Sequence, residues 1–294
     1  MKNSRPYLYV LLASLLWAST PAVVKLLLAD LNVLQILFFN NLFALIGLAV
    51  VTFIQGKLTL IRGYSRNDYV VFAWMGFLGV FLYTLFLSGA ISLLRAQEAY
   101  IINYLWPVMI LIFASVILKE KITKRKIVSI ICSFVGVSIV ITGGDLLNLK
   151  FGNFYGILLA VFGAVTYGLF SVTGKKQDYE KYTSMTIYYI FGFVYAVVSV
   201  LFFSEIPKIS IYQLAGLFWL GFFTSGLAFV FWFLALKHGD TAKMSSMIFL
   251  TPFLSLIYIY FMIGEKILFS SIAGLVIIVV GILIQSKSPN PRSF

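Results

Sequence analysis

The chain has 294 residues, of which 61% are hydrophobic and only 11% are charged. A water-soluble domain carries about a quarter charged residues to cover its surface, so this composition excludes a soluble protein and predicts a surface that faces hydrocarbon. The single Cys and single His exclude a disulfide framework and a Cys/His zinc cluster, and we expect neither a metal nor a cofactor.

A helix needs roughly 20 mostly apolar residues to cross a hydrocarbon core of about 30 Å. The sequence offers ten such stretches. In chain order they are Tyr7–Leu28, Val33–Ile54, Tyr69–Ala90, Leu93–Leu118, Ile127–Thr142, Phe154–Thr173, Thr183–Phe203, Tyr212–Leu236, Ala242–Ile263 and Phe269–Gln285. They leave short loops and no room for a soluble domain. The sequence therefore predicts an all-α integral membrane protein with ten transmembrane helices.

Lys and Arg concentrate on one side of these spans. With the N-terminus inside, 17 of the 22 cations fall in inner segments: Lys2, Arg5, Lys57, Arg62, Arg66, Lys119, Lys121, Lys124, Arg125, Lys126, Lys175, Lys176, Lys181, Lys237, Lys243, Lys287 and Arg292. The outer loops hold four: Arg95, Lys150, Lys208 and Lys266. Cytoplasmic loops carry such an excess, so both termini are predicted to be cytoplasmic. The net charge of +12 then reflects topology, and no nucleic-acid partner is expected.

The fourth and ninth spans can be superposed without a gap. Pro107 precedes Glu120 by 13 residues, and Pro252 precedes Glu265 by the same 13, at a constant offset of 145. The chain therefore divides into two five-helix repeats. We place them at residues 1–146 and 147–294. Because each repeat has an odd number of helices, the second repeat enters the membrane from the opposite side and is predicted to be inverted. Inverted repeats around a midplane site are typical of secondary transporters.

Pro107 and Pro252 stand near the middle of their spans. Each removes a backbone donor and should kink its helix. Kinks at matched depths favour hinges beside a cavity, although a plain packing kink is the alternative. Glycine pairs should let neighbouring helices approach closely; these are Gly76/Gly79, Gly163/Gly168 and Gly221/Gly226.

The fourth span is the most polar. Tyr100, Asn103, Tyr104 and Pro107 recur at helical spacing, and that face should point away from lipid. Glu98 is the only carboxylate within a span; it could accept a proton, bind a substrate ammonium or pair with Arg95. Lys25 is expected to reach the outer surface near Asp30. Aromatic residues beside small ones in mid-span are candidates for cavity walls: Trp17, Tyr83, Tyr167 and Trp232.

These features resemble the EamA family of the drug/metabolite transporter superfamily. The stretches Asn103–Pro107, Leu236–Asp240 and Thr251–Pro252 look like the bacterial aromatic amino acid exporter branch. The resemblance implies a central cavity bounded by helices one, three, four, six, eight and nine. Carried over by position, it points to Trp17, Tyr83, Glu98, Tyr100, Asn103, Trp106, Tyr167 and Trp232 as cavity residues. Asn40 and Asn41 stand where many members carry Arg, and Gly163 stands where many carry Trp.

The sequence thus predicts a secondary transporter of the cytoplasmic membrane that exports aromatic or other apolar amino acids by alternating access, with a small-molecule substrate, the lipid bilayer and protons as candidate partners. A broader transporter of drug-like amines, nucleobases or other metabolites is the first alternative. An intramembrane enzyme would need clustered His, Asp or Glu, which the spans lack. A purely structural membrane protein fits poorly with the paired prolines, and no catalytic residue is predicted.

Overall fold

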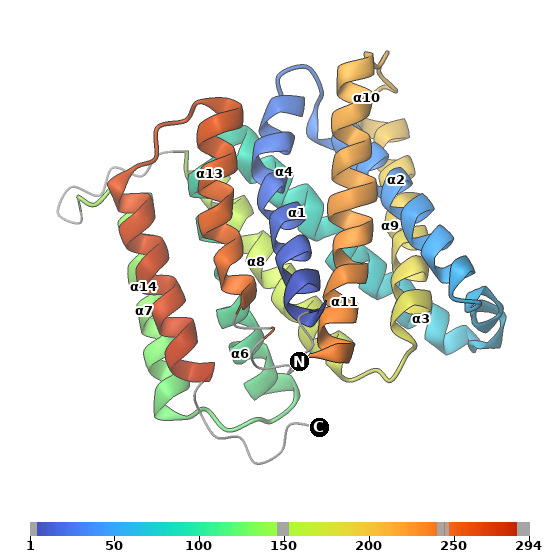
Figure 1. Cartoon of the computed structure of the whole chain (residues 1–294), viewed down its shortest axis with the longest axis horizontal. Coiled ribbons are helices and arrows are strands. Elements are labelled where there is room, and N and C mark those ends of the chain that lie inside the picture. Colours follow the sequence, from blue (N-terminus) through green and yellow to red (C-terminus); the bar gives the residue numbers. More distant parts are fainter. Residues whose placement is uncertain (1–4, 146–152, 240–243, 245–246, 287–294) are drawn as a thin grey trace.

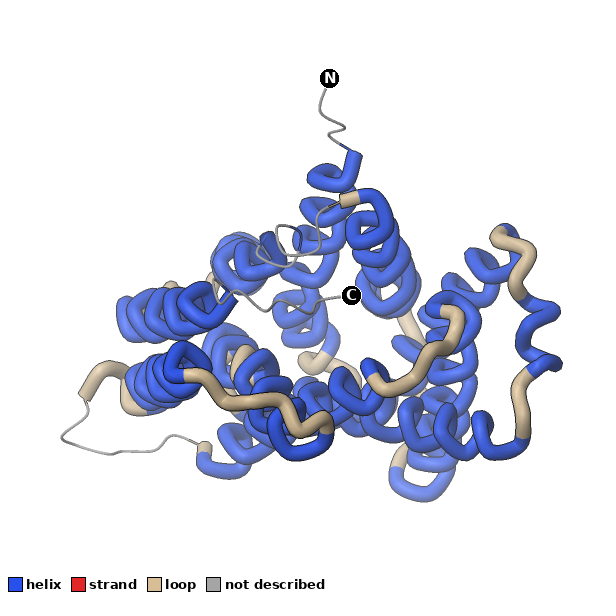
Figure 2. The backbone as a smooth tube through the Cα atoms, turned by 90° about the horizontal axis from the view of Figure 1, so that it is seen from below, coloured by secondary structure: helices blue, strands red, loops and turns tan. Residues whose placement is uncertain are grey.

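The computed structural model describes residues 5–145, 153–239, 244 and 247–286. All regular structure within these ranges is helical, and they contain no strand (Figure 2). The predicted repeat boundary after residue 146, Asp240 and the predicted start of the ninth span at Ala242 lie outside the described residues. So do the cations Lys2, Lys150, Lys243, Lys287 and Arg292.

Seven helical segments are long and apolar enough to cross a membrane. They are α1 (Arg5–Leu27), α2 (Val33–Ile54), the run Arg66–Leu93, the run Ala96–Ile117, α8 (Phe154–Lys175), α9 (Lys181–Phe203) and the run Ile211–His238. Two shorter apolar segments cover Ile248–Ile263 and Phe269–Ile284. The remaining long helix, α7 (Lys124–Ile141), begins with three consecutive cations. The chain is therefore a multi-pass membrane protein, while the count of ten spans stays a prediction.

Several of these segments are composite. The run Arg66–Leu93 joins α3 (Arg66–Met75), the π-helical η2 (Gly76–Leu82) and α4 (Tyr83–Leu93). The run Ile211–His238 joins α10 (Ile211–Phe218), the π-helical η3 (Trp219–Leu227) and α11 (Ala228–His238). The run Ala96–Ile117 holds α5 (Ala96–Asn103) and α6 (Trp106–Ile117), and the last segments are the short 3-10 helix η4 (Ile248–Leu250), α13 (Thr251–Ile263) and α14 (Phe269–Ser286). A further 3-10 turn, η1 (Leu58–Gly63), follows α2.

Short polar sequences start several helices. Ser65 caps α3 through a reciprocal pair with Asp68, and Asn32 caps α2 in the same way with Gln35. Such capping boxes satisfy backbone N–H groups that have no partner within the helix. They fix where the chain re-enters the apolar layer after each loop.

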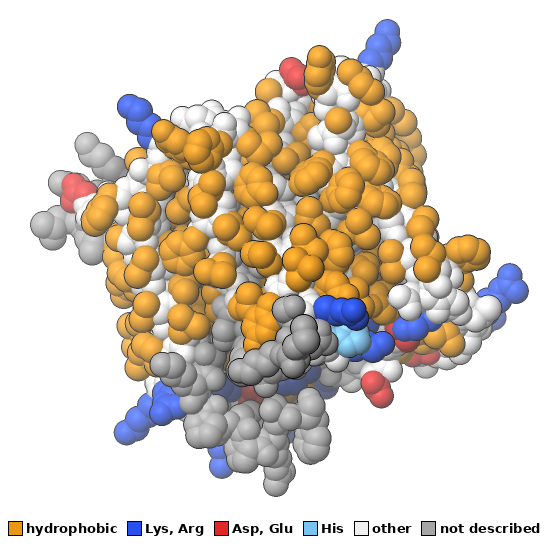
Figure 3. Space-filling view, in the orientation of Figure 1, with side chains coloured by type: hydrophobic (Ala, Val, Ile, Leu, Met, Phe, Trp, Pro, Cys, Tyr) orange, Lys and Arg blue, Asp and Glu red, His pale blue; other side chains and the backbone are white. Residues whose placement is uncertain are grey.

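The helices stand side by side and pack against one another in more than one row (Figures 1 and 2). α1 begins and α14 ends at the same end of the molecule, which we call the terminal end; the other is the opposite end. Hydrophobic side chains cover the face shown in Figure 3, and charged side chains gather at its two ends. Phe203 is 81% exposed and Phe261 is 78% exposed, as expected where the neighbour is lipid.

Both prolines of the matched pair interrupt their helices. Helix α5 ends at Asn103 and α6 begins at Trp106, with Pro107 in its first turn. In the second half, η4 gives way to α13 at Thr251, again with Pro252 in the first turn. A helix accepts proline at its start, where the missing N–H has no intrahelical partner. The sequence predicts a kink at these two positions, and the structure has a helix break at each.

The two π-helical segments occupy equivalent places in the halves and make equivalent close contacts. A Cβ on Gly76 in η2 would lie 2.6 Å from the carbonyl oxygen of Tyr188 in α9. A Cβ on Gly221 in η3 would lie 2.6 Å from the carbonyl oxygen of Asn40 in α2. The predicted close approach of helices at these glycines is confirmed, and each half supplies one partner to each crossing.

The buried apolar side chains of the described chain form separate clusters. Toward the opposite end one cluster of buried residues joins α1, α4, α5, η3 and other helices; it includes Leu27, Ile91, Ile101 and Leu220. Toward the terminal end the described residues form two separate clusters. One joins α2, α3, α9 and α11 around Phe72, and the other joins α1, α11 and Met244 around Val10. A fourth cluster joins α2, η2 and α9 around Leu37, Phe81 and Ala196 toward the opposite end, so the described apolar core is divided at both ends.

Candidate functional site: a central cavity

A cavity of 270 Å³ lies between the two halves of the described chain. Its walls come from α1, α2, η2, α4, α5, α6, α8, α9, η3, α11, η4 and α13. Among the described residues, those that line it include no Asp, Glu, Lys, Arg or His. The cavity is therefore an uncharged compartment inside an apolar bundle.

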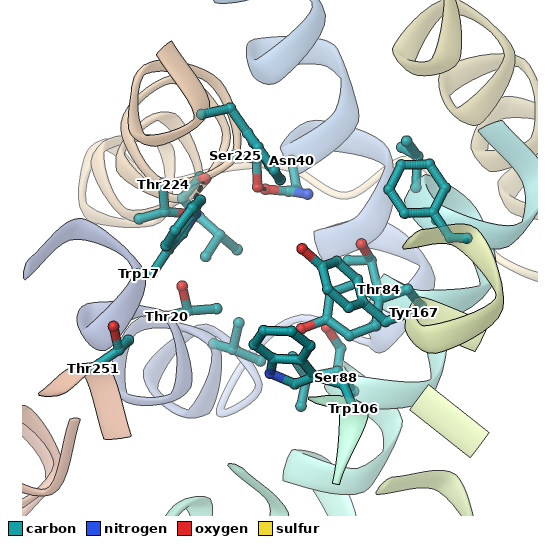
Figure 4. Close-up of a pocket in the computed structure, with 18 of the residues that line it drawn as sticks. Trp17, Thr20, Asn40, Thr84, Ser88, Trp106, Tyr167, Thr224, Ser225 and Thr251 are labelled. Carbon is teal, nitrogen blue, oxygen red and sulfur yellow. Dashed lines mark hydrogen bonds between the residues drawn. The ribbon is translucent and has the colours of Figure 1, made fainter. Parts of the chain in front are cut away.

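Aromatic rings form two opposing walls of this cavity (Figure 4). On one wall Tyr167 packs against Tyr83 with ring centroids 4.8 Å apart and against Trp106 at 5.2 Å. On the other wall Trp17 packs edge-on against Phe229 at 5.3 Å and Trp232 at 6.3 Å. A flat solute between the walls would meet ring faces and edges on both sides.

Neutral polar groups complete the lining. The Ser225 hydroxyl donates to Asn40 Oδ1 at 3.0 Å, which leaves the Asn40 amide N–H groups available to a solute. Thr20, Thr84, Ser88 and Thr251 add hydroxyl groups; the labelled side chains lie around the cavity in Figure 4. These amide and hydroxyl groups can both donate and accept, so they suit a solute whose charges balance.

Six of the eight side chains proposed from the sequence line this one cavity: Trp17, Tyr83, Tyr100, Trp106, Tyr167 and Trp232. Asn103 lies behind the wall, where its side-chain amide donates to the Tyr83 hydroxyl at 3.3 Å. The Asn103 Oδ1 atom lies against Gly163, and a Cβ there would be only 2.7 Å from it. Asn103 therefore positions Tyr83 rather than facing the cavity.

Glu98 is placed elsewhere. It lines a second pocket of 780 Å³ at the opposite end, together with Arg95, Thr142 and Ser270. Glu98 precedes Tyr100 by two residues, which is about 200° around an α-helix, so it points away from the face that meets the cavity. The structure thus separates Glu98 from the other proposed cavity residues.

Lys25 also differs from the sequence prediction. Its ammonium donates to the carbonyl oxygens of Ile91 at 2.8 Å and Leu94 at 2.7 Å. Asp30 instead accepts a hydrogen bond from Gln213 at 3.1 Å. The end of α4 lies closer to Lys25 than the sequence could show, and its free carbonyl groups attract the cation.

The sequence missed a set of cavity residues in α2, α9 and the π-helical segments. They are Asn40, Gly79, Val80, Met185, Tyr189, Leu220, Thr224 and Ser225. Asn40 could have been identified from the sequence, because a carboxamide in the middle of an apolar span needs polar partners. Thr224 and Ser225 could not be identified in this way, since hydroxyl groups in a helix can hydrogen-bond to the backbone of their own helix.

Ion pairs within the described chain lie at the terminal end. Glu120 accepts from Lys175 at 3.0 Å and from Lys126 at 3.1 Å, and Lys57 contacts Glu180 at 2.6 Å. The hydrogen bond from Lys175 lowers the pKa of Glu120 from its ordinary value. No group of three or more His, Cys, Asp or Glu that could hold a metal occurs among the described residues.

Comparisons with known proteins agree with this architecture. A model of the EamA-like transporter family matches residues 4–142 and again residues 154–286. A solved crystal structure with 19% sequence identity superposes with a TM-score of 0.69 over 97% of each chain. At this identity the superposition shows the fold alone.

Curated relatives carry transporter names. The uncharacterized transporter YyaM of Bacillus subtilis is 27% identical over 84% of this chain and 81% of its own. An uncharacterized transporter of Clostridium kluyveri is 27% identical over 96% of this chain and 93% of its own. YoaV, another uncharacterized transporter of Bacillus subtilis, is 23% identical over 94% of this chain and 95% of its own. These names indicate transport rather than enzymatic catalysis.

Proposed function

Because the chain belongs to the EamA-like transporter family, we propose that it moves small solutes without net charge, foremost aromatic or other apolar amino acids, out of the cytoplasm by alternating access. The substrate would occupy the cavity between the two aromatic walls. Amino acids are zwitterions at neutral pH, so their opposite charges cancel although each still needs polar contacts.

The uncharged, aromatic cavity is the observation that carries this proposal. Transferring an unpaired charge into such a site costs several kcal/mol, so anionic solutes such as sugar phosphates fit poorly. The volume of 270 Å³ lies near the lower limit of sites for drug-sized ligands, about 300 Å³, and therefore favours a small solute. Asn40 and the hydroxyl groups supply contacts for a carboxylate and an ammonium.

The charge distribution supports the proposed direction of the chain in the membrane. At the terminal end the described segments carry Arg5, Lys57, Arg62, Arg66, Lys119, Lys121, Lys124, Arg125, Lys126, Lys175, Lys176, Lys181 and Lys237, and at the opposite end Lys25, Arg95, Lys208 and Lys266. Because positive loops stay in the cytoplasm, the terminal end would be cytoplasmic. We propose that the cavity opens at this end and is closed at the opposite end, as in an inward-facing state.

The matched irregularities of the two halves support alternating access. Each half has a π-helical segment beside the cavity and a helix break at a proline, so the same bend can occur on either side of the midplane. Pro107 and Pro252 are the proposed hinges. Their neighbours Trp106 and Thr251 line the cavity, so bending at these prolines would move its wall.

A second candidate substrate class is favoured by the same rings. Trp17, Trp106 and Trp232 could hold an organic ammonium through cation–π contacts, each contributing about 0.5–2 kcal/mol. Amines, nucleobases and related metabolites therefore belong in the first substrate panel.

Counterflow in proteoliposomes tests the proposal. Vesicles loaded with unlabelled tryptophan or phenylalanine should transiently accumulate the labelled compound, because exchange needs no external driving force. Replacing Trp232 with Ala should raise the half-saturation concentration on the order of tenfold, since a buried aromatic contact is lost.

Trp74→Ala is the matched control, because Trp74 is 49% exposed on the outside of the bundle. It should exchange as the parent does. Failure of both amino acids to accumulate with folded protein would reject the amino acid substrate. Accumulation of an amine or nucleobase instead would establish the second candidate.

A further inference from the structure

Proline residues leave backbone acceptors free at two points of the cavity wall. In a regular helix the carbonyl four residues before each position accepts that residue's N–H, and proline has none. Pro21 lies inside α1, so the Trp17 carbonyl lacks its usual donor. Pro252 leaves the Ile248 carbonyl without its α-helical donor, although the Thr251 N–H still reaches it.

Two tyrosines of α5 and its C-terminal edge supply the missing donors. The Tyr100 hydroxyl donates to the Trp17 carbonyl at 3.2 Å. The Tyr104 hydroxyl donates to the Ile248 carbonyl at 3.1 Å. Tyr100 is 7% exposed and Tyr104 is 4% exposed, and both also line the cavity. One face of this segment therefore bonds to α1 and to η4 at the points where proline opened their hydrogen-bond ladders.

The junction between α4 and the start of α5 is held by two charges from the same neighbours. Lys25 of α1 donates to the last carbonyls of α4, and Glu265, which follows α13, accepts from the Ala96 N–H at 3.0 Å. A cation at a helix C-terminus and an anion at a helix N-terminus both match the helix dipoles. The buried Gln97 side chain adds a hydrogen bond to the Lys266 carbonyl at 2.9 Å.

We propose that Lys25, Tyr100, Tyr104 and Glu265 form a polar latch that holds the cavity closed at the opposite end and releases when the cavity opens there. The latch runs from mid-depth to the opposite end, alongside the apolar cluster that includes Leu27 and Ile91. It rests on the proposed alternating access. Tyr100 and Tyr104 act in it as positioning residues, independent of their contact with a solute.

Polar contacts suit such a latch better than apolar packing alone. When α5 moves away from α1 and α13, water entering from the opposite end can hydrate the released ammonium, carboxylate and carbonyl groups. Each lost hydrogen bond therefore costs little net free energy, and the latch can be reversible. Hydrogen bonds also depend on the angle between donor and acceptor, so these contacts disfavour closure with the helices shifted along one another.

Side-specific labelling of a single cysteine tests the latch. In a Cys132→Ser background, Thr20→Cys places one thiol on the cavity wall. A charged, membrane-impermeant thiol reagent is then applied from the opposite end or from the terminal end, using membranes of known sidedness. The initial labelling rate from each side is measured by mass spectrometry.

In the parent, labelling from the opposite end should be slow. Tyr100→Phe and Tyr104→Phe keep the rings and remove the hydroxyls, and Glu265→Gln removes the anion. Each should speed labelling from the opposite end by about two- to tenfold, the equivalent of one net hydrogen bond, without speeding it from the terminal end. A merely structural role would raise both rates or neither.

Tyr195→Phe is the matched control, because it removes a tyrosine–carbonyl bond of the same kind, to Ala73 at 3.3 Å, away from the latch. Asp30→Asn is the control for the lost carboxylate at the same end. Neither should change the labelling rate. Unchanged labelling in the three latch variants, an equal rise in the controls, or fast labelling of the parent from the opposite end would overturn the proposal.

Folding and transport readouts keep the interpretation clear. Each variant is compared with the parent by size-exclusion profile and melting temperature. If Glu265→Gln fails to fold, the conservative changes Tyr100→Phe and Tyr104→Phe still test the latch. Side-specific changes in labelling without amino acid exchange would support the latch and reject only the proposed substrate. Normal exchange with unchanged labelling would reject only the latch.

Discussion

Charge at single residues sets the chemistry of the cavity. No described carboxylate or cation lines it, whereas Glu98 and Arg95 line a separate pocket at the opposite end. The titratable side chains of the described lining are those of tyrosine, whose ordinary pKa is about 10. A proton carried through the cavity near neutral pH would therefore find no side chain there that readily exchanges it.

The position of Glu98 leads to a direct prediction. Glu98→Gln should leave tryptophan or phenylalanine counterflow within about twofold of the parent, because the residue is remote from the cavity and the substitution keeps its shape. The measurement is exchange at saturating and subsaturating substrate. Loss of pH-driven uptake with intact exchange would instead show that Glu98 carries the coupled proton.

Glu120 gives a pH-dependent prediction at the terminal end. Its lowered folded-state pKa means that Lys175 and Lys126 stabilise the fold above the unfolded pKa, about 4.3, and that this contribution is lost as the pH falls through the lower folded value. Glu120→Gln should reduce stability at pH 7 by up to about 1 kcal/mol, as expected for a partly exposed pair. Thermal melts of the parent and variant should converge as the pH falls through the lowered folded-state pKa of Glu120. A stability difference that persists once Glu120 is protonated would contradict this assignment.

Single residues also show where sequence reasoning succeeds and stops. Trp17, Tyr83, Tyr167 and Trp232 could be predicted because large aromatic residues in mid-span beside small ones signal an internal wall. Tyr100 followed from the polar face of the fourth span, and Trp106 from the family resemblance. The sequence could not place Asn40 beside Ser225, since their pairing depends on how α2 meets η3. Glu98 was grouped with the cavity by polarity, whereas its angle around the helix separates it.

At the scale of elements, the helix breaks should govern turnover. Pro107→Ala and Pro252→Ala allow the missing backbone hydrogen bonds to form and should stiffen the joints between the half-helices. We expect each variant to lower the exchange rate several-fold, on the order of 1 kcal/mol in the barrier, and to change substrate affinity less. Unchanged exchange in both variants would leave the prolines as packing features.

The π-helical segments give a prediction about packing. Gly76→Ala would bring a Cβ within 2.6 Å of the Tyr188 carbonyl oxygen and 2.8 Å of Phe191 Cβ. Because backbone must move, the free energy of unfolding should fall by about 1–3 kcal/mol. Gly63→Ala is the matched control, since no atom lies within 4 Å of its added Cβ. Equal melting temperatures for the two variants would contradict the close crossing.

Most of the elements were predictable, and their irregularities were only partly so. Apolar length located the helices, and proline chemistry located the breaks at Trp106 and Thr251. The π-helical segments were not predicted, because an i→i+5 bond pattern leaves no mark on hydrophobic periodicity when both sides of the helix are apolar. Their glycines predicted close contacts without naming the partners.

At the scale of the whole molecule, the described parts of the two halves meet around one space lined by aromatic and neutral polar side chains. The family membership, the paired helix breaks and the paired π-helical segments all support the proposed alternating access. In this mechanism the helix breaks of the two halves bend in turn and open the cavity to either side. The inverted arrangement of the repeats is a prediction from the odd number of predicted helices in each half, and it would give each helix break a counterpart across the midplane.

The most direct test of this account is competition for tryptophan counterflow by three indole compounds that differ in charge: tryptophan, tryptamine and indole-3-propionate. An uncharged aromatic cavity predicts that zwitterionic tryptophan competes and that the anionic propionate is weaker by about 100-fold or more, because its carboxylate would be buried without a counter-charge. Competition by tryptamine would extend the substrate range to amines through cation–π contacts. Competition by the propionate as strong as that by tryptophan would contradict the account.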